Sequence, residues 1–434
     1  MSTENNNPLG KLENTKHREI ITIILIISLS FLIRVGWMEH RHNYREVKDY
    51  ENGEIARNLI SGEGFSMVHT GSSSIVPTAH KPPFYPFFLA FVFKFFPQNP
   101  YFVIELIQAL ILSLSAVIIY LIAKRTYNSS TIGILSAGFM CLSPFVLSTH
   151  IRVENMSFAI FFLSLLILSL LELADKPTLK NSICSGFLFG LSTLNLAATL
   201  SFLPFSIIWL YWYVKKNISS FGKRIIMLLV VLLAFTATIL PWTVRNYFVF
   251  HKLVPISSTF PYQVYVSNNP SSTGGMFNEE GKAVTGIPDE LLAATKGMNE
   301  VEQYSYFGKY GWAFIKQFPL QFIKLRFKAL FYFWFGEAWW RKVFLTPKFE
   351  IYKILTIFML GISVIGISLS WRKYLRETLL LVFLFTAFSL LHSFTHGDIG
   401  FRYRLPLDPF LLIFSSVAFV SLFKWALAKY KFTD

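Results

Sequence analysis

Carboxylates and cations gather in a polar stretch that follows the first long apolar run of the chain. Asp49 comes directly before a segment in which apolar side chains repeat at helical spacing. We therefore expect a short amphipathic helix that begins after Asp49 and ends near Ser61-Gly62. A carboxylate held at the entrance of such a helix can act as a general base, and plain helix capping explains it as well. Asp49 and Glu51 would also share a face for a metal ion in an extended segment, but not in a helix.

A second reactive element is His80-Lys81, which is followed by Pro82-Pro83. The prolines restrict the backbone, so that His80 and Lys81 are presented on a stiff edge. Lys81 is suited to bind the phosphate of a lipid-linked substrate. It is equally suited to reach lipid headgroups, because both roles need the same chemistry.

Three further polar groups stand beside predicted membrane spans. Glu154, with Arg152 nearby, is a candidate second acid facing the same cavity as Asp49, and a local Arg152–Glu154 pair is the alternative. Arg245 ends one span, and Arg402 and Arg404 precede the last one. Basic residues on the outer side run against the positive-inside trend, so an anionic ligand or phospholipid contact is expected there.

These residues must be positioned by a membrane domain. Of 434 residues, 53% are hydrophobic and 15% are charged, with a mean hydropathy of +0.48. Apolar runs of roughly 20 residues, the length of a spanning helix, recur along the chain. We predict an all-α polytopic membrane protein with about ten transmembrane helices. They lie near 20–37, 101–123, 131–149, 153–173, 183–198, 200–214, 224–242, 351–371, 378–396 and 406–425.

The net charge of +15 is explained by topology rather than by nucleic acid, which is not expected as a partner. With a cytoplasmic N-terminus, the concentrated Lys and Arg of the short links all fall on the cytoplasmic side. Two large extracytoplasmic segments then remain. One follows the first span and the other follows the seventh. The two cysteines offer no metal-ligand spacing.

We divide the chain into a cytoplasmic tail (1–19), a transmembrane domain (20–425) and a second tail (426–434). Outer loop 38–100 is expected to be catalytic, and outer loop 243–350 to form the acceptor side. Residues 82–96 and 318–335 are expected to be interfacial helices, the second with its basic side chains at headgroup depth.

The order of these motifs resembles the GT-C superfamily of membrane glycosyltransferases, in particular the protein O-mannosyltransferase and lipid A aminoarabinose transferase branch. The motifs are the first-loop Asp before Glu-Ile-Ala-Arg-Asn-Leu, then Lys-Pro-Pro-Phe-Tyr-Pro, an acid between spans three and four, Pro-Trp-Thr-Val-Arg-Asn-Tyr, and Arg-Tyr-Arg-Leu-Pro. The resemblance covers most of the chain, but 250–350 contributes little.

The resemblance implies an inverting glycosyltransferase that takes a monosaccharide from a polyprenyl-phosphate-linked donor. The acceptor would be a hydroxyl of a lipid, glycan or protein at the extracytoplasmic face of the cell (inner) membrane. It implies Asp49 as the base and Glu154 as the second acid. Donor phosphate would be bound by Lys81, Arg402, Arg404 and Arg245. Further candidates for the site are Glu51, Arg57, His80, Tyr85 and Arg152.

Two departures from relatives concern a metal. Relatives often carry Asp-Glu in the first loop, where this chain has Asp49-Tyr50, and some carry Glu at the position of His80. A divalent metal is therefore left open, and no other cofactor is expected. The alternative function is a transporter or flippase of lipid-linked sugars. The lack of an evident internal repeat and the charges at the outer boundary favour an enzyme.

Overall fold

The computed structural model describes residues 8–45, 47–68, 74–275, 277, 282, 286–336, 347–395 and 402–430. Its longer helices are α1 (Pro8–Arg41), α4 (Pro100–Tyr127), α7 (Met156–Asp175), α8 (Leu179–Asn195), α10 (Phe221–Phe250), α13 (Glu300–Gln317), α14 (Pro319–Phe335), α15 (Pro347–Trp371), α16 (Leu375–Thr395) and α17 (Asp408–Tyr430). Shorter ones are η1 (Asn43–Arg45), α2 (Tyr50–Ser61), α3 (Phe84–Phe95), α5 (Ser130–Leu142), α6 (Pro144–Leu147), η2 (Ala197–Phe202), α9 (Leu203–Val214), α11 (Thr259–Ser267) and α12 (Asp289–Ala294). The strands β1 (Ser66–Val68) and β2 (Ile75–Pro77) form one antiparallel pair.

Eight helical segments of the described chain are long and apolar enough to cross a membrane. They are 17–41, 100–127, 156–175, 197–214, 221–250, 351–371, 375–395 and 408–428. The predicted all-α, multi-pass architecture is thereby confirmed, but the count of about ten spans is not.

The two remaining predicted spans are interrupted helices. The stretch 131–149 breaks where α5 ends, because Pro144 forces Ser143 into an extended conformation (φ −62°, ψ 119°). The stretch 183–198 ends at Leu196, which is also extended, and the chain continues in the 3-10 helix η2. At the N-terminus, α1 begins at Pro8, so residues 8–19 of the expected cytoplasmic tail are helical.

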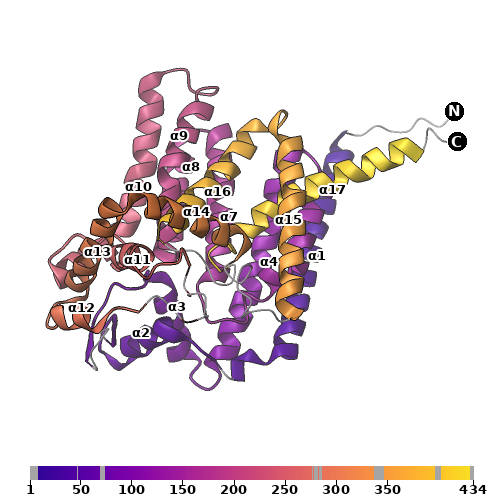
Figure 1. Cartoon of the computed structure of the whole chain (residues 1–434). Helices are drawn as coiled ribbons and strands as arrows, with labels where there is room; N and C mark the ends of the chain where they lie inside the picture. Colours follow the sequence, from indigo (N-terminus) through magenta and orange to yellow (C-terminus); the bar gives the residue numbers. More distant parts are fainter. Residues whose placement is uncertain are drawn as a thin grey trace, which may run out of the picture.

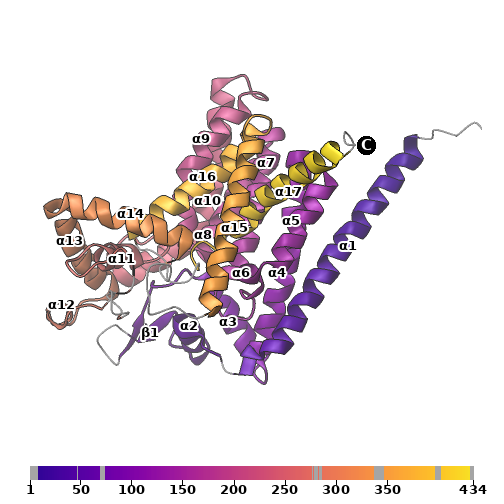
Figure 2. The same cartoon turned by 45° about the vertical axis from the view of Figure 1, so that its right-hand side comes forward.

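Helices of the bundle pack closely through small residues. Gly186 and Gly190 on α8 face α10. A Cβ built on Gly186 would lie 2.3 Å from the carbonyl oxygen of Val231, and one on Gly190 would lie 2.5 Å from Cβ of Thr238. Glycine four residues apart is the pattern that lets two membrane helices approach closely. α1, by contrast, stands at the edge of the bundle, beside α4 and α5 (Figure 2).

The bundle has two different ends. The link between α9 and α10, the turn between α15 and α16 and the C-terminal end of α17 lie at one end (Figures 1 and 2). The short elements α2, α3, β1 and α12 lie at the other, and α11, α13 and α14 extend to one side above them. The predicted cytoplasmic links therefore share one end of the molecule, and the predicted catalytic loop lies at the opposite end.

The predicted interfacial helices occur as α3 and α14. α3 has 12 residues, too few to span a bilayer. Lys324 and Lys328 of α14 are exposed, but Arg326 is turned inward and donates to the carbonyl oxygens of Phe394 (2.6 Å) and Ser267 (2.8 Å). The expectation of headgroup contact is therefore wrong for Arg326, which ties α14 to the ends of α16 and α11.

Candidate active site

Asp49 occupies the N-cap position of α2, as predicted, but its side chain makes no capping hydrogen bond. Its carboxylate instead accepts from Arg57 Nη1 at 2.5 Å and from the Tyr101 hydroxyl at 2.8 Å. A Cβ added at Gly53 would lie 1.9 Å from Asp49 Oδ2, so only glycine leaves room for this arrangement. Asp49 is 8% exposed. Capping therefore does not account for this carboxylate.

Lys81 lies beside the start of α2. Its Nζ is 3.4 Å from Glu51 Oε2. Burial lowers the pKa of Lys81, helped by the cation of Arg402, while Glu51 opposes the shift. Burial would raise the pKa of Glu51, but the Lys81 cation, backbone hydrogen bonding and His80 together outweigh burial, and the pKa is lowered. Glu51 is thus held as a carboxylate beside Lys81.

Glu154 faces the same cavity and pairs with a residue from the far end of the sequence. Arg402 Nε lies 3.5 Å from Glu154 Oε2. The local Arg152–Glu154 pair considered above is not what the structure shows. Glu154 therefore lines this cavity, but Asp49, which was expected to face the same cavity, does not line it.

These four groups line one cavity of about 410 Å³. Two carboxylates (Glu51, Glu154) face two cations (Lys81, Arg402) across it. The other lining residues are Tyr50, Asn52, Met67, His80, Val153, Tyr262, Gln263, Tyr304 and Tyr403. A polar cavity with balanced charge suits a ligand that carries both an anionic group and hydroxyls.

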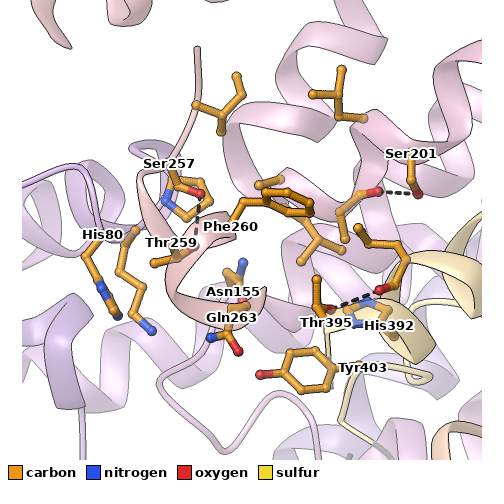
Figure 3. A pocket seen from close by; sticks show the side chains of 18 of the residues that line it. His80, Asn155, Ser201, Ser257, Thr259, Phe260, Gln263, His392, Thr395 and Tyr403 are labelled. Carbon is orange, nitrogen blue, oxygen red and sulfur yellow. Dashed lines mark hydrogen bonds between the residues drawn. The ribbon is translucent and has the colours of Figure 1, made fainter. Parts of the chain in front are cut away.

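A second cavity of about 540 Å³ shares six residues with the first, among them Lys81 and Arg402. Its remaining wall is largely apolar and comes from the α8–η2 segment, the start of α11 and the end of α16. Figure 3 shows His80 on one side of it, Phe260 near the middle, and His392 with Thr395 across from His80. The cationic pair therefore stands where a polar cavity meets an apolar one.

His80 is held neutral at this boundary. Its Nδ1 is hydrogen-bonded to the Tyr304 hydroxyl at 2.9 Å. Burial, aided by the neighbouring Lys81 cation, lowers the pKa of His80 to about 3. His80 therefore acts at neutral pH as an uncharged hydrogen-bonding group.

The predicted cation Arg404 lies elsewhere. It is fully buried and pairs with Asp408 at 2.9 Å. It lines neither of the two cavities. In this conformation it links the start of α17 to the carbonyl oxygen of Trp334.

Arg245 is also turned away from the cavities around Lys81. It donates to the carbonyl oxygens of Thr78 (2.7 Å) and Phe65 (2.8 Å). Its guanidinium also stacks over Trp242, 4.9 Å from the ring centroid. It thereby fastens the β1–β2 hairpin to α10 and lines a separate apolar groove on that side.

The remaining predicted residues are Tyr85, Arg152 and Arg57, which lie behind the residues that line the cavities. Tyr85 is buried and donates to Gln108 Oε1 at 2.9 Å. Gln108 in turn donates to the backbone carbonyl of Arg152. Arg57 holds Asp49, as described above. The part of the last motif at 396–401 lies outside the described residues.

One group of site residues was not predicted. Tyr262, Gln263 and Tyr304 come from the outer segment that the sequence patterns left least interpreted. They line the cavity with residues far away in the sequence, such as His80, which is bonded to Tyr304, and no short motif signals them. Among the described residues, no three His, Cys, Asp or Glu side chains come close enough together to hold a metal ion.

Comparison with known proteins gives one match in sequence. Residues 80–242 match the dolichyl-phosphate-mannose-protein mannosyltransferase family. A search of the curated proteins found no match.

Solved structures of ArnT from Cupriavidus metallidurans are similar to the chain. The structure bound to undecaprenyl phosphate has 14% identity and a TM-score of 0.40, over 91% of this chain and 77% of that one. The apo structure has 13% identity and a TM-score of 0.35, with the same coverage. At TM-scores of this size, the positions of residues and ligands do not transfer from those structures. It is over residues 80–242, which include Lys81 and Glu154, that the predicted resemblance to the GT-C mannosyltransferase branch is confirmed.

Proposed function

We propose that this protein is an inverting glycosyltransferase of the extracytoplasmic membrane face. It moves a monosaccharide from a polyprenyl-phosphate-linked donor to an acceptor hydroxyl. The observation that carries the proposal is the meeting of Lys81 and Arg402 where a polar and an apolar cavity join. The family matched over residues 80–242 is described by a lipid-phosphate-linked sugar, which is the same class of donor.

The apolar and polar parts of the donor are proposed to bind in different cavities. The phosphate is proposed to lie between Lys81 and Arg402, whose cations form charge-assisted hydrogen bonds with phosphate oxygens. The apolar cavity takes the first isoprene units, and the sugar enters the polar cavity. Phosphate binding takes Lys81 from Glu51 and Arg402 from Glu154, so the donor itself releases two carboxylates.

In the proposed reaction, the acceptor oxygen attacks the anomeric carbon as the bond from that carbon to the phosphate oxygen breaks. The acceptor proton passes to a carboxylate, and polyprenyl phosphate leaves with the bonding electron pair. The cations stabilise the charge that grows on the phosphate. Glu154 is proposed to orient the acceptor.

Asp49 is proposed as the base. It directly precedes Tyr50 and Glu51, which line the polar cavity, and it is not used for capping. To accept a proton it must leave Arg57, whose side chain is 53% exposed. Glu51 is the competing carboxylate, because it lines the cavity itself.

The test compares Asp49→Asn, Glu51→Gln and Glu154→Gln in a purified transfer assay with a synthetic polyprenyl-phosphate sugar. Loss of a general base costs about 10²–10⁴-fold in kcat. Asp49→Asn should show this loss while still binding polyprenyl phosphate. Near-normal kcat in Asp49→Asn together with a large loss in Glu51→Gln would transfer the role to Glu51. Lipid movement without sugar transfer by the wild type would favour the transporter instead.

A further inference from the structure

Glu300 is a buried carboxylate outside both cavities. It is the first residue of α13 and is 4% exposed. It accepts hydrogen bonds from the backbone N–H of Ala79 at 2.9 Å, from Ser258 Oγ at 2.5 Å and from Thr78 Oγ1. Three donors from two distant segments thus converge on one side chain.

Each residue from Thr78 to His80 is tied to this part of the molecule. The His80 N–H donates to Thr78 Oγ1, and the N–H of Ser258 donates to the carbonyl oxygen of Ala79, both at 2.9 Å. Tyr304 lies one helical turn after Glu300, on the same face of α13, and its hydroxyl bonds to His80. The next residue in the chain is Lys81.

Arg245 holds the same segment from the opposite side. It binds the carbonyl oxygen of Thr78, while Glu300 binds the hydroxyl of that residue. Glu300 itself is compensated by the three hydrogen bonds that it accepts. A buried carboxylate needs such compensation, because leaving water is costly for a charged group.

We propose that Glu300 is a positioning residue for Lys81. By fixing Thr78–His80 to α11 and α13, it sets where the lysine enters the cavity. A lysine side chain is long and flexible, so its reach is decided by its backbone anchor. Pro82 and Pro83 stiffen the chain on the other side of Lys81. The role in donor binding rests on the proposed function. It assigns Glu300, which belongs to the segment 243–350 expected to form the acceptor side, to the donor side instead.

The test compares Glu300→Gln with Glu300→Asp. The first removes the charge and places an NH2 group against donors; the second keeps the carboxylate but shortens its reach. We expect Glu300→Gln to raise the donor KM about tenfold, with kcat and the acceptor KM little changed. Glu300→Asp should recover part of the loss. Glu302→Gln is the matched control, because Glu302 is on the same helix, its side chain is 43% exposed, and a glutamine retains its capping box.

A second measurement follows Lys81 without relying on transfer. Its amine is modified with a water-soluble acylating reagent and quantified by mass spectrometry. Lys81 should react several-fold faster in Glu300→Gln than in the wild type or in Glu302→Gln. Thr78→Val, which removes only one of the donors, should raise the rate less, and Thr78→Ser should leave it unchanged.

The outcomes separate the inference from the function. Unchanged Lys81 reactivity and donor KM in both Glu300→Gln and Thr78→Val would overturn the positioning role. Addition of undecaprenyl phosphate to the wild type should protect Lys81 from the reagent. Faster labelling in Glu300→Gln without any such protection in the wild type would support the positioning role and reject Lys81 as the phosphate ligand.

Discussion

At the scale of single residues, the site is a set of opposite charges that hold one another until a ligand arrives. Lys81 is paired with Glu51 and Arg402 with Glu154. A phosphate would replace both carboxylates at once. The pairs therefore predict that cation and carboxylate substitutions affect different kinetic constants.

Lys81→Ala should weaken donor binding more than acceptor binding. A charge-assisted hydrogen bond is worth about 1.5–3 kcal/mol, so the donor KM should rise about 10- to 100-fold. Steady-state kinetics with each substrate varied in turn measure the split. Lys48→Ala removes an exposed cation from the same loop and should change neither constant. A larger effect on the acceptor than on the donor would remove Lys81 from the phosphate site.

His80 gives a prediction on pH. Its pKa is about 3 in the folded protein, against about 6.5 in an unfolded chain. Between these values the unfolded chain binds a proton that the folded protein does not, so the free energy of unfolding falls as the pH drops below about 6.5. His80→Gln cannot titrate, and its thermal midpoint should fall less between about pH 7 and pH 4. Parallel curves for the two proteins would contradict the buried, neutral histidine.

At the scale of elements, the site depends on helices that are joined through side chains rather than through neighbouring sequence. α2 supplies Glu51, the segment before α3 supplies Lys81, and the segment before α17 supplies Arg402. α13 holds the second of these through Glu300 and Tyr304. Within the bundle, α8 and α10 pack closely against each other.

That contact can be tested at Gly186. An added Cβ would lie 2.3 Å from a backbone oxygen of α10, which cannot yield without moving the helix. Gly186→Ala should therefore lower the thermal midpoint by several degrees, since overpacking costs about 1–3 kcal/mol. Gly138→Ala is the matched control, because nothing lies within 4 Å of its added Cβ. There the better helix propensity of alanine should leave stability equal or higher.

At the scale of the whole molecule, the two ends of the bundle differ in what they contain. Basic links gather at one end, and both cavities lie among elements of the other (Figure 2). Two buried charges of the spans, Arg34 and Glu105, stand about two turns and about one and a half turns inside the cavity end of α1 and α4, respectively. Both buried charges thus lie toward the cavity end of their helices.

The orientation is testable by cysteine labelling in intact cells. Cys141 and Cys184 are first replaced by serine, and cysteine is then placed at Lys296 or Lys216, both exposed. A membrane-impermeant maleimide should label the first in intact cells and the second only after permeabilisation. The reverse pattern would place the cavities on the cytoplasmic side.

The sequence by itself determined that the chain is a membrane protein and which side chains could do chemistry. Long apolar runs, the bias of basic links and residue types are all local properties. It also predicted α2 and its end at Gly62, whose φ of 91° is the left-handed cap expected of glycine. Its count of about ten spans is not confirmed among the described residues, because Ser143 and Leu196 interrupt two helices whose composition is still apolar.

Only the tertiary structure decided which charges share a cavity. Asp49 and Glu51 are two residues apart, yet one is bound by Arg57 and the other faces Lys81. Arg402 and Arg404 are also two residues apart, yet one meets Glu154 in the cavity and the other is buried with Asp408. In each pair the two side chains carry the same charge, and the difference comes from the partners that packing brings to each of them.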